Sequence, residues 1–400
     1  MTQPNTQSTL RNRYRGLWRL GPVWYGSAWV LGLLLYVPLQ RYLSFEDFGV
    51  FHQAAARYLA GEPLYRLGDG HLSFKYFPTT ALLLAPLGAL PLAWASALWL
   101  GCLVAGLLAI YRTSLRWTGA SAWPIGALAC VVLLKATGRE LMLGQVNLLM
   151  GLGLVAAFRT QHRPAYAALW ATLAIALKPY AVAIWPYWVV RRQWQALALS
   201  ATGVVALGLL SLLRYPVAEW PALYEGFTAT TFGSNARLFT ALDNVSLWGA
   251  YSRWFGAAPL GAPLALWVGL SLVVLAAPLV PRWWRGAYTP VRLQLEGSAL
   301  LVLLVLATPQ GWDYTICLAV PAVVLLLHRR NALPTGLRVL VYLSLALTGL
   351  TLYDLVVPLV GRAGFEALRA SGLYTLALAV WVLALGWLHH SKYDASPSAQ

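Results

Sequence analysis

Two neighbouring carboxylates, Glu46 and Asp47, follow the first apolar run of the chain, Gly21 to Leu43. That run is long enough to cross a bilayer once, so the acidic pair lies at a membrane surface. Lys75 and Tyr76 follow in the same polar segment. Charged side chains at a membrane are costly and mark functional positions. A carboxylate held there suits general-base chemistry, in which it removes the proton of a hydroxyl group.

The residues after Asp47 predict an amphipathic helix. Apolar side chains share one face at three- and four-residue spacing, namely Phe48, Phe51, Ala54, Ala55, Tyr58 and Leu59. Gly61-Glu62-Pro63 ends the pattern, as glycine followed by proline commonly does. We expect this helix to lie in the membrane interface with its apolar face down, which fixes Asp47 at the helix start. The alternative is that Asp47 is only an interfacial charge.

Other polar groups interrupt the apolar runs, and all are expected at the outer ends of spans. They are Thr137-Gly138-Arg139-Glu140, Gly144-Gln145-Val146-Asn147, Lys178-Pro179-Tyr180, Asp243-Asn244-Val245-Ser246 with Arg253, and Thr308-Pro309-Gln310-Gly311-Trp312-Asp313-Tyr314. The cations suit a phosphate, although Lys178 also fits a lysine that snorkels to lipid headgroups. Trp312 suits sugar stacking.

Gln145 and Asn147 allow two interpretations. They either contact a ligand or satisfy the backbone of a broken helix. Because they are two residues apart, they face different sides of a regular helix, and both cannot then contact the same ligand.

The composition is that of a membrane protein. Only 10% of the residues are charged and 59% are hydrophobic, whereas a soluble chain carries about a quarter charged residues. The net charge of +16 comes from basic residues scattered between apolar runs, without a stripe. This distribution excludes a nucleic-acid partner and fits the rule that basic loops stay inside. The sequence therefore predicts an all-α polytopic protein of about 10 to 13 transmembrane helices.

The spans can be placed approximately along the chain. We expect them near 21–43, 76–90 with 92–111, 118–136, 144–158, 164–177, 179–190, 195–213, 262–280, 294–307, 313–327, 335–353 and 372–388. Counting 76–111 as one broken crossing puts both termini in the cytoplasm. Three runs have only 12 to 15 residues, and such short helices are tolerated where they line a wet cavity. Their breaks fall near Gln145 and at Lys178-Pro179.

The chain divides simply. A basic cytoplasmic N-terminus, 1–20, precedes one transmembrane catalytic domain, 21–390, with outer loops 44–78 and 214–260. The tail 391–400 is predicted to be disordered and cytoplasmic. His389-His390 fits a solvated pair on the inner face. No metal-ligand spacing is present, and the three cysteines fit the apolar core.

Taken in order, these motifs resemble glycosyltransferase family 87, which contains polyprenyl-phosphate-dependent mannosyltransferases of the glycosyltransferase-C class. The resemblance covers roughly residues 25 to 325. It is carried by Asp47-Phe48-Gly49-Val50-Phe51 through Ala55, Gly61 and Leu64-Tyr65, by Phe74-Lys75-Tyr76-Phe77-Pro78, by a GQxN motif at 144–147, by Lys178-Pro179, by Asn244-Val245-Ser246 with Arg253, and by Thr308-Pro309 with Trp312-Asp313. Two departures stand out. Tyr314 replaces a histidine that family members often carry, and Phe77 interrupts the usual Tyr-Pro-Pro.

The resemblance implies an inverting, metal-independent sugar transfer in an outer-face cavity, with no cofactor besides the lipid-linked donor. Asp47 would be the base, with Glu46 and Asn244 secondary. The donor phosphate would meet Lys178 and Arg253, and more weakly Arg139 and Lys75. The remaining candidates would contact sugar or donor: Tyr76, Gln145, Asn147, Trp312, Asp313 and Tyr314.

The expected partners are membrane lipid, a polyprenyl-phosphate sugar, with mannose as the expected sugar, and a glycolipid or glycan acceptor. The site would face outward from a plasma (inner) membrane that the chain crosses many times. Two alternatives stay open. One is a transporter or flippase of lipid-linked sugars, because broken helices and intramembrane charge are transporter traits too. The other is a lipid-linked glycan ligase or polymerase.

Overall fold

The computed structural model describes residues 21–39, 41–66, 68–69, 73–118, 122–233, 236–256, 261–280, 284 and 289–390. Within these segments every regular element is a helix, and no strand occurs. The predicted all-α fold is therefore confirmed. The predicted basic N-terminus, 1–20, and the predicted disordered tail, 391–400, lie outside the described residues.

Most helices follow one another with short connections, and a longer segment, 61–77, joins α3 to α4. In chain order the α-helices are α2 (Gly21–Leu39), α3 (Glu46–Ala60), α4 (Pro78–Gly88), α5 (Leu92–Thr118), α6 (Ala122–Leu143), α7 (Asn147–Arg159), α8 (Pro164–Leu177), α9 (Ile184–Val190), α10 (Trp194–Leu212), α11 (Trp220–Thr228), α12 (Ala236–Phe239), α13 (Leu247–Phe255), α14 (Ala262–Ala276), α16 (Pro290–Ala307), α17 (Val320–His328), α18 (Thr335–Leu350), α19 (Tyr353–Ala370) and α20 (Leu373–His390). The 3-10 helices are η2 (Pro179–Ala183), η3 (Val217–Glu219), η5 (Asp313–Ala319) and η6 (Arg330–Ala332), and η4 (Ala229–Gly233) is a π-helix.

Several helices suit a bilayer by length and composition. Among the described residues, α5, α10, α16 and α20 are each long and apolar enough to cross one, and two bent pairs raise the number to as many as six. Of the four, α16 is the most enclosed, with 83% of its apolar window buried, whereas α10 has only 17% buried. A polytopic membrane protein is thus confirmed, and the expected number of about 10 to 13 transmembrane helices stays a prediction.

The expected break near Gln145 is confirmed. Helices α6 and α7 meet at 116°, and α6 runs on through Thr137 to Glu140, which the sequence had placed beyond a span. Gly144, at φ +69°, ends α6 in the left-handed conformation. The Gly144 and Gln145 amides donate to the carbonyls of Leu141 and Glu140, which is the paired cap of a Schellman motif.

A second break falls at Lys178, as predicted. Helix α8 ends at Leu177 and the 3-10 turn η2 begins at Pro179. Lys178 between them is extended, at φ −143° and ψ 117°. The residue before a proline is driven out of the helical region by the proline ring, so the sequence Lys-Pro dictates this interruption.

Helix α3 forms as predicted but packs differently. It spans Glu46–Ala60 and ends at Gly61, which has φ +73°. Its apolar face lies against the protein and not against lipid: Phe48 is fully buried and stacks on Trp99 with ring centroids 5.2 Å apart. Leu59 is the exception, because 43% of it is exposed. The expected contact of this apolar face with the membrane is therefore wrong, and the position of α3 at the membrane interface stays a prediction.

Between the last two predicted spans, helix α19 lies at 91° to α18. One further expectation fails near the C-terminus. His389 is not solvated but fully buried, with Nε2 3.4 Å from the Glu296 carboxylate. Only His390 is exposed. The buried carboxylate of Glu296 on the neighbouring helix α16 explains the difference, because the sequence around His389 does not show this contact.

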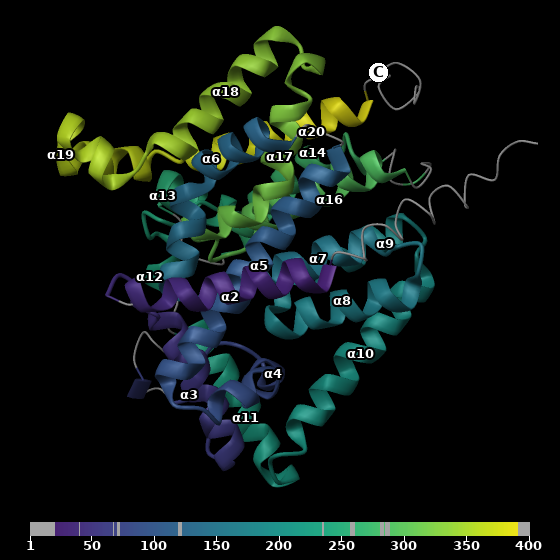
Figure 1. Ribbon diagram of the computed structural model, residues 1–400, viewed down its shortest axis with the longest axis vertical. Coiled ribbons are helices and arrows are strands. Elements are labelled where there is room, and N and C mark those ends of the chain that lie inside the picture. The colour runs from purple at the N-terminus through teal and green to yellow at the C-terminus, as the bar shows by residue number, and fades with distance from the viewer. Residues whose placement is uncertain are drawn as a thin grey trace, which may run out of the picture.

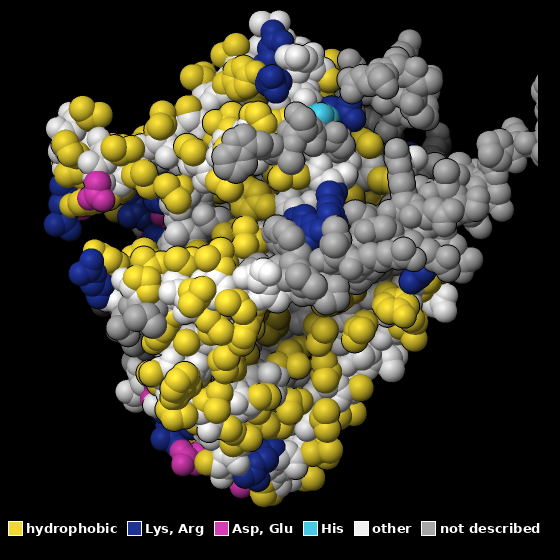
Figure 2. Space-filling view, viewed as in Figure 1, with side chains coloured by type: hydrophobic (Ala, Val, Ile, Leu, Met, Phe, Trp, Pro, Cys, Tyr) yellow, Lys and Arg dark blue, Asp and Glu magenta, His cyan; other side chains and the backbone are white. Residues whose placement is uncertain are grey.

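The elements that carry the predicted outer segments gather at one end of the molecule. In Figure 1, α3, α12, α13 and α19 lie toward the left, whereas α9 and the end of α20 lie toward the right. Hydrophobic side chains cover much of the face in Figure 2, and its acidic side chains lie toward the left and lower edges.

The α6–α7 turn yields the first prediction. A Cβ at Gly144 would lie 2.5 Å from Phe45 Cδ1 and 2.7 Å from Phe48 Cβ, and φ is +69°. Gly144→Ala should therefore cost about 2 kcal/mol or more and lower the unfolding temperature in detergent. Gly138→Ala is the matched control, since a Cβ there meets nothing within 4 Å. Equal unfolding temperatures for the two variants would contradict this view of the turn.

Candidate active site

The start of α3 is tied to the α6–α7 turn. The Phe45 amide donates to the Met142 carbonyl at 2.9 Å, and Ser44 Oγ donates to the same oxygen at 3.3 Å. Trp99 Nε1, from α5, donates to the Gly144 carbonyl at 2.7 Å. These bonds fix Asp47, in the first turn of α3, beside the residues that follow Gly144.

Lys178 lies at the centre of this region and is buried, with only 6% of its surface exposed. Its ammonium donates to Gln145 Oε1 at 3.1 Å and to Asn147 Oδ1 at 2.8 Å. The expectation that these two amides face different sides applied to a regular helix, and it does not apply here because Gln145 precedes α7. The broken span is what brings both amides to one cation.

Aromatic rings complete the surroundings of the ammonium. Lys178 Nζ lies 5.6 Å from the ring centroid of Tyr76 and 5.5 Å from that of Tyr180. The Tyr180 hydroxyl also donates to Asn147 Oδ1. Ring faces attract a cation, most strongly where water is excluded. Together these contacts offset part of the cost of burying the charge.

A fully buried carboxylate lies behind the amides. Glu140, in the last turn of α6, accepts hydrogen bonds from Asn147 Nδ2 at 2.8 Å and from the Leu148 amide at 3.1 Å. We call Asp47, Glu140, Gln145, Asn147 and Lys178 the Lys178 cluster. The sequence placed Glu140 in a polar group without giving it a role. An acid inside an apolar span, just before Gly144, was the available signal.

Asp47 lies at the edge of the Lys178 cluster and remains partly exposed, whereas Glu46 is exposed. Burial raises the pKa of the Asp47 carboxyl above its ordinary value; hydrogen bonding from Gln145 and the charge of Lys178 oppose that rise. Lys75 lies close enough for Asp47 to act on it, and burial lowers the pKa of its ammonium. Asp47 therefore combines access to solvent with a carboxyl that is readier than usual to hold a proton.

A second set of charges lies next to the first. The guanidinium of Arg139 pairs with Asp313 at 2.5 Å and with Asp243 at 2.9 Å. Lys135 and Arg369 approach the same carboxylates at 3.4 to 3.7 Å. These five residues are the ion-pair cluster. Lys135 and Arg369 were not anticipated, because they come from α6 and α19, whose proximity the sequence does not show.

Tyr314 connects the two clusters. Its buried ring lies 5.8 Å from the Arg139 guanidinium. Its hydroxyl lies within electrostatic range of Asp47, Tyr76 and Glu140. Arg139 in turn acts on Asp47. The tyrosine that stands in place of the often-observed histidine therefore faces the candidate base.

Asn244 and Arg253 hold the loop between α12 and α13. Asn244 Nδ2 donates to the Pro309 carbonyl at 2.8 Å, and Ser246 caps α13 by accepting from the Gly249 amide at 3.1 Å. Arg253 donates to the carbonyls of Ala241 and Asn244, at 2.8 and 3.0 Å. The side chains of this motif thus bind main chain, and they hold the loop against the segment that carries Trp312.

The predicted site residues fall into three groups, apart from Glu46, which is exposed. The structure brings together Asp47, Lys75, Tyr76, Gln145, Asn147, Lys178 and Tyr314. Arg139 and Asp313 belong to the neighbouring ion-pair cluster, and Asn244, Arg253 and Trp312 belong to the loop scaffold. No group of three or more potential metal ligands occurs among the described residues.

Comparison with known families covers much of this arrangement. Residues 74–309 match the family model described as Glycosyltransferase family 87, which is more than half of the chain. The chain belongs to glycosyltransferase family 87. It is thus a membrane glycosyltransferase. No curated protein and no solved structure matches it significantly.

The family 87 match includes Lys178 and both amides of the Lys178 cluster, but it begins after Asp47 and ends before Trp312. The position of Asp47 in the site therefore depends on the contacts of α3 described above. Those contacts link it directly to the matched Gly144 turn.

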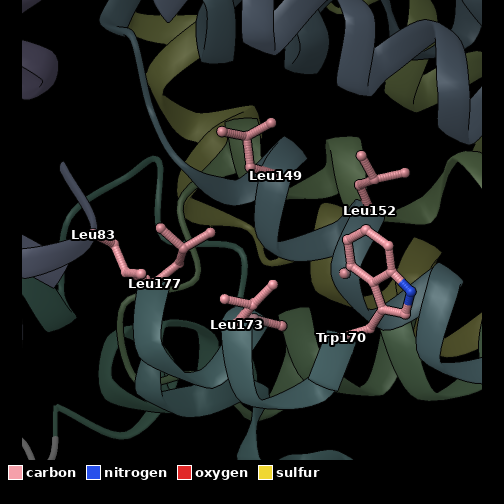
Figure 3. Close-up of a pocket in the computed structure, with 8 residues that line it drawn as sticks. Leu83, Leu149, Leu152, Trp170, Leu173 and Leu177 are labelled. Atoms are coloured by element: carbon pink, nitrogen blue, oxygen red, sulfur yellow. The ribbon is translucent and has the colours of Figure 1, made fainter. Parts of the chain in front are cut away.

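An apolar cavity lies between α4, α7 and α8. It is lined by Leu83, Leu149, Leu152, Gly153, Trp170, Leu173, Ala174 and Leu177. Figure 3 shows the labelled leucines and Trp170 of these helices around it. Leu177 immediately precedes Lys178, and Leu149 is two residues from Asn147. The lining is thus close to the Lys178 cluster along the chain, but it includes none of the residues of that cluster.

The ion-pair cluster supplies the second prediction. Asp313 is 5% exposed and faces three cations, whereas Asp243 is 22% exposed and faces two. Because removing the better buried partner leaves more uncompensated charge, Asp313→Asn should lower the unfolding temperature more than Asp243→Asn. We expect a difference of a few degrees in detergent. A lower unfolding temperature for Asp243→Asn than for Asp313→Asn would contradict this expectation.

Proposed function

We propose that this family 87 enzyme transfers a hexose, with mannose as the first candidate, from a polyprenyl-phosphate donor to a glycolipid or glycan. The reaction inverts the sugar and uses no metal. The observation that carries the proposal is the juxtaposition of a partly exposed carboxylate, Asp47, with a buried ammonium, Lys178, joined by Gln145. One group suits the acceptor and the other suits the departing phosphate.

Asp47 acts on the acceptor in this proposal. Its carboxylate removes the hydroxyl proton while the acceptor oxygen forms a bond to the anomeric carbon. The bond from that carbon to the phosphate oxygen breaks on the opposite face, and its electron pair leaves with the phosphate. A single base is enough, because a phosphate departs as an anion and needs no proton from a second carboxylic acid.

Lys178 receives the negative charge that accumulates on the phosphate. A cation fixed in a water-poor site stabilises such charge without reorganising. Lys75, also close to Asp47, is the next candidate. Arg139 and Arg253 remain proposed phosphate ligands with a weaker case, since one faces two carboxylates and the other faces main-chain carbonyls.

The aromatic and amide side chains would hold the sugar. Tyr76, Gln145, Asn147 and Tyr314 lie around the two reacting groups, and Trp312 and Asp313 border them. The polyprenyl chain would lie in the apolar cavity of Figure 3, whose lining includes Leu177, the residue before Lys178. Because the donor is linked to a lipid, it would reach Asp47 and Lys178 from the bilayer. We place this site on the extracytoplasmic side of the plasma membrane, with both termini in the cytoplasm.

The acidic pair gives a matched test of the base. Asp47→Asn should reduce transfer from polyprenyl-phosphate mannose at least about a hundredfold, because the amide cannot accept the proton. Glu46→Gln removes the same charge from the exposed neighbour and should leave transfer within about twofold. Label from the donor is followed into larger lipid or polymer products, with membrane insertion measured for each protein.

The outcomes separate the parts of the proposal. Equal loss in both variants would remove Asp47 from the chemistry. Translocation of donor lipid without transfer by the wild type, unchanged in Asp47→Asn, would favour a flippase. Should the wild type use a different lipid-phosphate sugar, the enzyme class stands and mannose is replaced.

The dependence of transfer on pH follows from Asp47. The base must be deprotonated, so kcat/KM falls as pH drops through its pKa. Because burial raises that pKa above the ordinary 3.8, activity should decline at a higher pH than an ordinary aspartate would give. The phosphodiester donor does not titrate in this range. An acidic limb of kcat/KM at or below pH 3.8, with Glu46→Gln as control, would contradict Asp47 as the base.

A further inference from the structure

Glu140 has no counterpart in the proposed chemistry, yet it is fully buried inside the membrane domain. A carboxylate in such a place is costly unless hydrogen bonds and an opposite charge compensate it. Both are present. Asn147 Nδ2 and the Leu148 amide donate to its two oxygens, and the charge of Lys178 acts on it.

The bond from Glu140 fixes which way the Asn147 amide points. A carboxylate oxygen only accepts, so the Asn147 amino group faces Glu140 at 2.8 Å. The Asn147 oxygen must then face the other way, where it accepts from Lys178 at 2.8 Å and from the Tyr180 hydroxyl. Glu140 thus determines that Lys178 faces the oxygen of Asn147, although the ammonium does not itself bond to Glu140.

The same logic continues to Asp47. Lys178 donates to Gln145 Oε1 at 3.1 Å, so the Gln145 amino group is left for the opposite side. There it acts as a donor toward the Asp47 carboxylate. The Asn147 amide can hold only one orientation as long as Glu140 carries no proton, and the Gln145 amide is oriented by the donor that Lys178 presents to it. The resulting order is Glu140, Asn147, Lys178, Gln145 and Asp47.

We propose that Glu140 is a positioning residue whose carboxylate orients the Asn147 amide, and through it both Lys178 and Asp47, for sugar transfer. The inference rests on the proposed function for the roles of Lys178 and Asp47. Glu140 is too buried to contact an acceptor, so it acts only through its neighbours. Its contacts also join the end of α6 to the start of α7, which keeps the broken span in register.

Exchanging the two side chains tests this orientation. In Glu140→Gln the new amino group faces that of Asn147, so the amide must turn over and present a donor to Lys178. In Asn147→Asp two carboxylates face each other. The double variant Glu140→Gln/Asn147→Asp restores one donor and one acceptor at the contact, keeps an oxygen for the Leu148 amide, and returns a carboxylate oxygen to Lys178.

We expect kcat to fall about tenfold or more in each single variant and to recover to within about threefold of the wild type in the double variant, as strongly coupled neighbours do in a mutant cycle. Recovery by exchange is not expected if Glu140 only adds stability. Full activity of Glu140→Gln, or a double variant that is inserted but no more active than the single ones, would overturn the proposal.

Glu296 provides the matched control. It is also a fully buried carboxylate, but it pairs with Tyr187 and Arg292 in a separate group. Glu296 lies eleven residues before Ala307, the last residue of α16. About 16 Å along the helix axis therefore separate Glu296 from the end of α16 that leads to Trp312. Glu296→Gln should lower the unfolding temperature while leaving kcat within about twofold of the wild type. A tenfold loss of kcat in this control would show that removing any buried carboxylate has the same effect.

A second readout does not depend on turnover. Dicyclohexylcarbodiimide modifies protonated carboxyls in apolar surroundings, and the Asp47 peptide can be followed by mass spectrometry. Loss of the Gln145 hydrogen bond favours the protonated form, so Glu140→Gln should speed modification of Asp47 about threefold or more. The double variant should return the rate to that of the wild type. Equal rates in the wild type and Glu140→Gln would refute the positioning role.

The two readouts separate the proposals. If the wild type transfers from no lipid-phosphate sugar, the proposed function fails, and the Asp47 modification rates still decide whether Glu140 positions it. If the wild type transfers sugar but the exchange fails in both assays, the function stands and the positioning role of Glu140 is rejected.

Discussion

The buried ammonium of Lys178 is the constraint on which the site depends. A charge with 6% of its surface exposed must be compensated by the protein. Two amide oxygens and two aromatic rings supply most of that compensation, and they come from segments far apart in the chain. Holding those groups around one cation requires the backbone to bend where the polar residues occur, which is where α6 and α8 end.

Interrupted helices would be unfavourable if they faced lipid, because their exposed backbone groups would lack partners. Here each interruption is paired within the protein. The Gly144 turn uses its own helix carbonyls and the indole of Trp99, while Glu140 accepts from the Leu148 amide in the first turn of α7. The same bonds that satisfy the backbone therefore bring the functional side chains together. Stability of the turn and geometry of the site are two consequences of one set of contacts.

The ion-pair cluster and the α12–α13 loop form a second layer around this centre. Arg139 lies between two carboxylates, and Arg253 fastens the loop through main-chain carbonyls. A cation that occurs in a motif can thus hold segments of the protein together instead of binding a ligand. The sequence alone gives no means of distinguishing these two uses. The buried Tyr314 spans both layers, so the change from the often-observed histidine falls where the base and the scaffold meet.

The sequence by itself determined the class of fold, the helix α3 with its glycine stop, and both breaks, because apolar length, glycine and Lys-Pro act locally along the chain. It also supplied Asp47, Gln145, Asn147 and Lys178 as candidates, since polar residues are conspicuous in an apolar chain. Only the tertiary structure decided which of them meet. It turned the apolar face of α3 onto Trp99, buried His389 against Glu296, aimed both amides at one ammonium and gave Glu140 its partners. These outcomes depend on side chains that approach through space from distant segments, and local patterns carry no record of such neighbours.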